Sequence, residues 1–243
     1  MNKLNLESMW LTPNWTAPKQ VQALITLRAC GDMRDLSSVQ KLMQEIKLPS
    51  YPIFLEQVHE NTVIIAEPEA YLRQADASIA IKPNQVCAIL TADCLPILLC
   101  DITGKYIAAI HGGWRSLAAN IIEKTIIQLE LKGCNRDNLM VWFGPAIGPE
   151  MFFVGESVQK NFLSLDRQFK TAFQPAVQEN QKKWVGNLVK IAKLQFAKLG
   201  INQFFGGEYC TYSNPETFFS YRRSQEDSRI ASGRMATLIW MNH

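Results

Sequence analysis

The sequence predicts a mixed α/β fold built around a mixed β-sheet. Strand-like and helix-like patterns interleave along the 243 residues, but many neighbouring strand-like segments have no helical segment between them. Parallel neighbours need such a crossover, so this order excludes a purely doubly wound sheet. Apolar residues make up 47% and charged residues 19% of the chain, which is typical of a globular protein with a substantial core.

Apolar patterns and turn residues define the elements of the first half. We expect a short strand around 22–27, then a helix that begins near Asp35 and ends before Pro49. The segment 85–101 has the pattern of two buried strands, interrupted at Cys94–Leu95–Pro96. Further strand-like patterns cover 51–59, 61–68, 75–82 and 106–113.

The second half is expected to contain more helix. Apolar spacing predicts a helix over 116–131 with Gly133 as its stop signal, then a strand that runs into a Gly/Pro loop over 139–149. Residues 156–200 are expected to be mostly helical, with Gly200 as the C-terminal cap. The tail is expected to form a strand, a polar loop and a closing strand.

Composition excludes several classes of protein. The net charge is only +3 and the basic residues are scattered, whereas nucleic-acid binders carry a basic face or stripe. No run of about 18 apolar residues is free of charges and breakers, so we expect no membrane-spanning helix. The six cysteines form no CxxC pair, and the first residues have no apolar signal-peptide core. We therefore expect a cytoplasmic protein with reduced thiols.

Two of the three histidines and one cysteine lie where strand-like segments end or break. His59 ends one such segment, Cys94 lies at the break, and His111 precedes Gly112-Gly113. Two imidazoles and a thiolate suit zinc and leave its fourth position for water or substrate. Spacing equally allows a metal-free nucleophile–base pair of Cys94 and His111, and cysteine is often buried for packing alone.

The residues next to these three have more than one interpretation. Asp93 could orient an imidazole, carry a proton or cap a turn. Gly112-Gly113 before a helix leaves backbone N–H groups that suit an anion, and Arg115 adds a cation suited to phosphate or carboxylate. The alternative for Arg115 is an ordinary surface ion pair.

A series of motifs carries a resemblance to a known family over residues 20–240. In order they are LEQVH, ADASIAI, TADCLPILL, IAAIHGGWRSLAANII, GPAIGP, VGESV, CTYS, FFSYRR and SGRMA. Together they resemble the bacterial laccase-domain family, first labelled polyphenol oxidase. Its members are also described as purine nucleoside phosphorylases with adenosine deaminase activity, and one branch as a peptidoglycan editing factor.

The resemblance implies a fold, a metal and a reaction. It implies one domain over 1–243 with a sandwich-like core, and a catalytic zinc held by His59, Cys94 and His111. The substrates would be phosphate and purine nucleosides such as adenosine or inosine, with deamination of adenosine as a side activity. The zinc deaminases pair their metal with an H-x-E glutamate that this chain lacks, so Asp93 is the candidate proton carrier. The candidates for anion binding are Arg28, Arg115 and Arg223.

Three departures from the family pattern fall near the expected site. The segment 29–38 is shorter than the usual glycine-rich loop that follows Arg28 and is expected to cover the site. Glu60 stands where a glycine is common, and Phe153 stands where the family usually has a glutamate. These changes affect the expected substrate preference.

Three other functions remain as alternatives. One is a metal-free Cys94/His111 hydrolase that edits peptidoglycan precursors. A second is a copper-dependent phenol oxidase, which we disfavour because multicopper sites draw heavily on imidazoles and this chain has three histidines, one of them His243. The third is a binding protein with a vestigial site.

Overall fold

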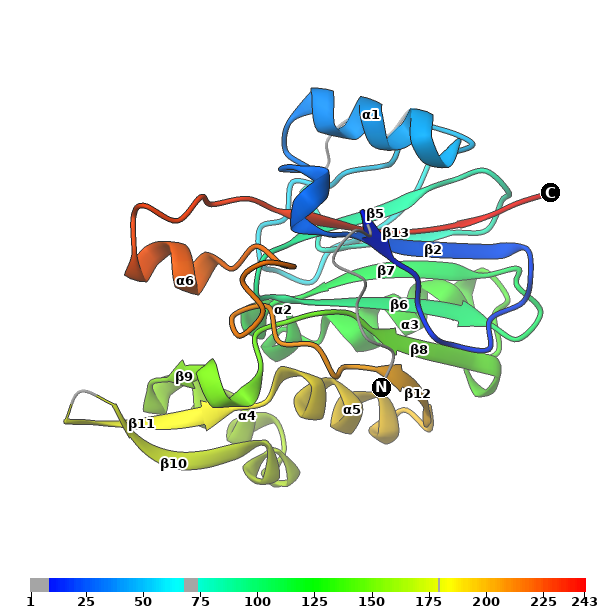
Figure 1. Cartoon of the computed structure of the whole chain (residues 1–243). Helices are drawn as coiled ribbons and strands as arrows, with labels where there is room; N and C mark the ends of the chain where they lie inside the picture. The colour runs from blue at the N-terminus through cyan, green and yellow to red at the C-terminus, as the bar shows by residue number, and fades with distance from the viewer. Residues whose placement is uncertain (1–8, 68–73, 179) are drawn as a thin grey trace.

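The computed structural model describes residues 9–67, 74–178 and 180–243. They are arranged in layers, with helix α1 (Leu36–Ile46) above a four-stranded sheet, a six-stranded sheet beneath it, and helices α3 (Ile121–Leu131) and α5 (Leu188–Lys198) below (Figure 1). The predicted mixed α/β class is confirmed. Within the described residues, no helix has the length and apolarity needed to cross a membrane.

The six-stranded sheet forms the centre of the molecule. Its middle pairs are antiparallel, whereas β12 with β8 and β3 with β4 run parallel, so the sheet is mixed. Every residue of β4, β6, β7 and β8 is buried, which is expected of strands covered on both faces. In spatial order the strands are β12 (Gln203–Gly206), β8 (Leu139–Phe143), β6 (Leu95–Asp101), β7 (Ile107–Gly112), β4 (Ala77–Ala80) and β3 (Val63–Ile65).

The four-stranded sheet packs on one face of the six-stranded sheet and makes the core sandwich-like. Ile89 and Ile239 from the four-stranded sheet lie in one buried cluster with Leu98 of β6. The strands pair antiparallel in the order β1 (Trp10–Leu11), β2 (Val21–Thr26), β13 (Met235–Met241) and β5 (Cys87–Thr91). Helix α1 (Leu36–Ile46) covers the outer face through Val39 and Leu42.

Helices cover the opposite face of the six-stranded sheet. Their buried residues include Ile126 and Phe196, which pack with Phe143 of β8. The helices below the sheet are α2 (Trp114–Ala118), α3 (Ile121–Leu131), α4 (Glu156–Leu165) and α5 (Leu188–Lys198). Short 3₁₀ turns occur at Arg28–Cys30, Arg136–Asn138, Pro149–Met151 and Arg167–Ala172.

A small sheet extends from the α4 side of the molecule (Figure 1). It consists of β10 (Phe173–Gln178), β11 (Gln181–Gly186) and β9 (Phe153–Val154), all paired antiparallel. This hairpin lies inside the region 156–200 that was predicted to be mostly helical. Most of its residues are exposed or half-buried, so no apolar stripe marks it in the sequence.

Three other elements differ from the prediction. The helix expected over 116–131 is split at Asn120, which has a left-handed φ of 62° that asparagine tolerates. Residues 51–59 make only isolated bridges, Ile53 with Cys87 and Glu56 with Gln74, and form no regular strand. The tail contains a helix, α6 (Tyr221–Glu226), where a polar loop was expected.

The contact between β12 and β8 predicts a stability difference between two glycine substitutions. Gly206 has a φ of +70°, and an added methyl would overlap the carbonyl oxygen of Phe143 and the Trp142 ring. Gly200 has a φ of +83° with nothing nearby. Gly200→Ala should cost about 1–2 kcal/mol for the left-handed backbone alone. Gly206→Ala should cost about 1–3 kcal/mol more, because it also overpacks the contact. Equal midpoints of the two variants in urea unfolding would contradict this.

Candidate metal centre and its cavity

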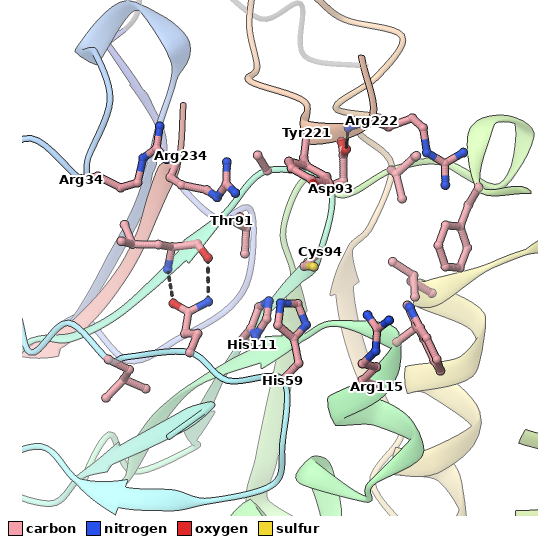
Figure 2. A pocket seen from close by; sticks show the side chains of 18 residues that line it. Arg34, His59, Thr91, Asp93, Cys94, His111, Arg115, Tyr221, Arg222 and Arg234 are labelled. Atoms are coloured by element: carbon pink, nitrogen blue, oxygen red, sulfur yellow. Dashed lines mark hydrogen bonds between the residues drawn. The ribbon is translucent and has the colours of Figure 1, made fainter. Parts of the chain in front are cut away.

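His59, Cys94 and His111 come together from three segments of the chain. The candidate ligand atoms of the three side chains all lie within 4.8 Å of one another. Cys94 immediately precedes β6, and in the pairing of β6 with β7 Leu95 lies opposite Gly112 and Pro96 opposite His111. The register of one strand pair therefore places the thiol beside the His111 imidazole. His59 reaches them from the loop before β3 (Figure 2).

Gly113 makes room for both imidazoles. A Cβ at this position would lie 2.8 Å from Nδ1 of His59 and 3.3 Å from Cε1 of His111. The rings themselves pack edge to face with their centroids 4.7 Å apart. The second glycine of the HGGWR motif is thus required by close approach of the two candidate ligands.

A buried carboxylate, Asp76, contacts both histidines and is not among the site residues predicted from the sequence. Its Oδ1 lies 2.7 Å from Nδ1 of His111 and accepts the backbone N–H of His59 at 3.0 Å. Its Oδ2 accepts the backbone N–H of Glu60 at 2.7 Å. The available signal was a lone carboxylate inside the apolar strand pattern ADASIAI, since a fully buried charge needs partners.

The electrostatics of the two imidazoles differ. Burial and the neighbouring His111 lower the pKa of His59, which favours the neutral form that binds metals. Burial alone would also lower the pKa of His111, but the Cys94 thiolate and the Asp76 carboxylate outweigh it and raise that pKa to about 9. These neighbours therefore favour the protonated form of His111 when no metal is bound.

The residues present fit a zinc ion. Nδ1 of His59 is buried and makes no hydrogen bond among the described residues. Two imidazole nitrogens and one thiolate form a donor set that zinc uses in catalytic sites with an open fourth position. The wall of a cavity includes all three side chains, so a fourth ligand could reach the metal.

Asp93 lies beside Cys94, the candidate metal ligand, and accepts several structural hydrogen bonds. Its Oδ1 accepts the Thr211 hydroxyl at 2.6 Å, and its Oδ2 accepts the Ser220 hydroxyl at 3.0 Å and the Arg222 backbone N–H at 2.7 Å. Thr211 belongs to the CTYS motif, and Ser220 and Arg222 belong to SYRR, so both motifs supply hydrogen-bond donors to this carboxylate. Asp93 also lines the cavity, and its role as a proton carrier stays a prediction.

The triad opens on a cavity of about 640 Å³, a volume typical of small-molecule sites. Four arginines line it, and Figure 2 shows them on different sides of the triad: Arg34, Arg115, Arg222 and Arg234. Arg34 is paired with Asp32. In the described part of the chain the other three form no ion pair, so the cavity suits an anionic ligand. The apolar part of its wall includes Trp114, Ile147, Phe152 and Leu188.

Only one of the three predicted anion-binding arginines lines this cavity. Arg115 does, with its guanidinium 4.5 Å from the centroid of the Trp114 ring. Arg223 is buried and its guanidinium donates to three backbone carbonyls, those of Thr211, Tyr212 and Phe218. It therefore stabilises the local backbone. Arg28 donates to the carbonyl of Pro215 and is outside the cavity wall.

The departures from the family pattern fall around the cavity. Arg34, from the shortened segment 29–38, contributes to its wall. Glu60 is exposed and meets Asp76 only through its backbone. Phe152 adds an apolar surface beside the position where the family usually has a glutamate, and Arg222 donates weakly to the carbonyls of Met151 and Phe153.

Comparisons with known proteins identify relatives over nearly the whole chain. A family model described as multi-copper polyphenol oxidoreductase laccase matches residues 32–242. Proteins named purine nucleoside phosphorylase from Pseudomonas aeruginosa and Haemophilus influenzae are 38% and 39% identical, over 96% and 95% of this chain and 98% of each relative. The crystal structure of a Neisseria meningitidis protein, 33% identical, superposes with a TM-score of 0.85 over 97% of this chain and 100% of its own.

The burial of the cysteines predicts how many thiols a reagent can modify, and this number should change when metal binds. Cys94 and Cys210 are partly exposed, whereas the other four are buried. Burial raises the pKa of Cys87, Cys100 and Cys134 to about 12, so these thiols stay protonated and unreactive in mildly alkaline solution.

A thiol reagent should therefore modify Cys94 and Cys210 in metal-free native protein, and only Cys210 after zinc is added. The Cys94→Ser variant is the control, and its count should not respond to zinc. A wild-type count that zinc leaves unchanged would show that Cys94 is not a ligand.

Proposed function

The chain belongs to the multi-copper polyphenol oxidoreductase laccase family, and we propose that it is a zinc-dependent purine nucleoside phosphorylase acting on adenosine and inosine. The observation that supports this most is the His59/Cys94/His111 triad on the wall of a cavity that also presents arginines without acidic partners. Phosphorolysis of a nucleoside needs an anion site for phosphate, an interaction with the leaving base and positioning at the glycosidic bond, and a bound metal would polarise an attacking or leaving group. The names of the relatives agree with this reaction.

Zinc suits this centre better than a cluster of copper ions. Multicopper centres draw on many imidazoles, whereas this chain has three histidines, of which His243 is the last residue. When bound, zinc would supply Lewis-acid polarisation of a reacting oxygen. All six cysteines are free thiols, which suits a reducing compartment, and we propose that the protein works in the cytoplasm.

The protein's own groups would bind the two substrates on different surfaces. Arg115 and Arg222 present guanidiniums to the cavity, and a planar guanidinium can bind phosphate through two hydrogen bonds. Trp114 and Phe152 offer aromatic faces on which a purine can pack. Phosphate held by the arginines would then be positioned to attack the ribose carbon of the glycosidic bond, with the base leaving.

One observation favours a second candidate, the metal-free hydrolase. The Cys94 thiol and the His111 imidazole have ligand atoms within 4.8 Å of each other, and a thiol beside an imidazole is an arrangement that nucleophilic cysteine enzymes use. A hydrolase of this kind would act on amide bonds, including those of peptidoglycan precursors. Metal analysis of freshly purified protein separates the two candidates, since a bound zinc would block the thiolate.

The proposed reaction predicts a phosphate requirement. Zinc-loaded protein given adenosine or inosine should release free adenine or hypoxanthine only when phosphate is present, as followed by chromatography. Inosine formed from adenosine in the same run would report deaminase side activity. Cys94→Ser should lose both reactions, because it removes a zinc ligand. Base release that continues without phosphate would contradict phosphorolysis.

The proposed phosphate site predicts a selective defect for Arg115→Gln. Loss of a charge-assisted hydrogen bond costs roughly 1.5–3 kcal/mol. The KM for phosphate, rather than the KM for nucleoside, should therefore rise by about tenfold or more, at about 1.4 kcal/mol per tenfold. Arg136→Gln, which removes an arginine paired with Glu130 outside the cavity, is the matched control. An unchanged phosphate KM in Arg115→Gln would remove Arg115 from the phosphate site.

A further inference from the structure

We propose that Asp76 is a positioning residue that sets the geometry of both histidine ligands and so determines the affinity of the metal site. The proposal rests on the proposed function, because it requires the triad to bind zinc. Asp76 precedes β4 and its side chain is completely buried. It contacts both histidines but is not part of the triad itself.

The first step concerns the tautomer of His111. An ionised carboxylate can only accept hydrogen bonds, so Nδ1 of His111, 2.7 Å from Oδ1 of Asp76, must carry the proton. In the neutral ring the lone pair then lies on Nε2, the nitrogen left to bind a metal beside Cys94. The main chain fixes the same residue, because the backbone N–H of His111 donates to the carbonyl of Asp76 at 2.7 Å. Ring and backbone are thus both oriented by one residue.

The second step concerns the turn that carries His59. This residue has a φ of +63°, a left-handed conformation that costs a residue with a side chain roughly 1–2 kcal/mol. The Asp76 carboxylate accepts the successive backbone N–H groups of His59 and Glu60, which offsets that cost. Without this acceptor the two N–H groups would lose their partner, and the turn would relax away from Cys94.

The third step concerns the charge. A fully buried carboxylate is costly unless it is well hydrogen-bonded, and Asp76 has three donors plus a longer contact, 3.4 Å, from the Ser116 hydroxyl. Outer groups that orient a metal-binding histidine in this way typically change metal affinity by about 10–100-fold. The arrangement is therefore preorganised for the metal, and both histidines depend on one side chain.

Asp101 provides a matched control. It is a buried carboxylate too, and it accepts the backbone N–H groups of Thr103, Lys105 and Tyr106 in the turn between β6 and β7. This turn lies at the opposite end of the two strands from Cys94 and His111, and Asp101 does not line the cavity. Asp101→Asn should lower stability in the same way as Asp76→Asn without changing the metal ligands.

The test measures zinc affinity by competition with a chromophoric chelator, together with the visible absorption of the cobalt-substituted protein and the thermal midpoint of the metal-free protein. Asp76→Asn should weaken zinc binding by about 10–100-fold and change the cobalt spectrum. The asparagine side chain has one acceptor oxygen where the carboxylate has two, so it cannot accept all three hydrogen bonds that Asp76 accepts. Asp76→Ala should weaken zinc binding at least as much, and Asp76→Asn keeps the test valid if the alanine variant does not fold. Asp101→Asn should bind zinc as the wild type does.

Two other outcomes would overturn different conclusions. Wild-type zinc affinity and cobalt spectrum in Asp76→Asn, with only a lower thermal midpoint, would show that Asp76 serves the fold alone. A wild-type protein that binds neither zinc nor cobalt would overturn the proposed function, and the positioning role with it.

Discussion

The antiparallel register between β6 and β7 is the constraint on which the site depends. It sets Leu95 opposite Gly112, and so brings Cys94 beside His111 at one end of the central sheet. A shift of one residue would turn every side chain to the opposite face of the sheet. Burial of both strands makes such a shift costly, so the core that stabilises the fold also fixes two of the three candidate ligands.

Two aspartates connect this framework to the parts of the site that lie outside the strands. Asp76 holds the left-handed turn at His59, while Asp93, itself at a φ of +92°, precedes Cys94 and holds helix α6 through Ser220 and the backbone of Arg222. Backbone strain of this kind persists only where the surroundings enforce it. These hydrogen bonds connect motifs that are distant in sequence to the candidate metal centre, and they bring Arg222 to the cavity wall.

Elements with strong apolar patterns were predictable, and those that depend on tertiary contacts were not. The buried strands β5, β6 and β7 and helix α1 follow from periodicity, and the three candidate ligands follow from family resemblance. Helix α6 depends on a cap that uses Ser220 and Asp93, far apart in sequence, and the exposed hairpin β10–β11 has no apolar stripe. Arg34 and Arg234 are far apart in the sequence and line the same cavity only because of the fold. No sequence pattern therefore marked them as cavity residues.

The proposed function and the positioning role of Asp76 both require that this triad holds one zinc ion. X-ray absorption at the zinc edge, on protein purified without added metal, tests it most directly. We predict one zinc per chain with a single sulfur ligand at about 2.3 Å and nitrogen or oxygen ligands at about 2.0–2.1 Å, as two histidines, one cysteine and a solvent or substrate atom would give. A zinc environment without sulfur, or a protein that carries copper in its place, would contradict the claim.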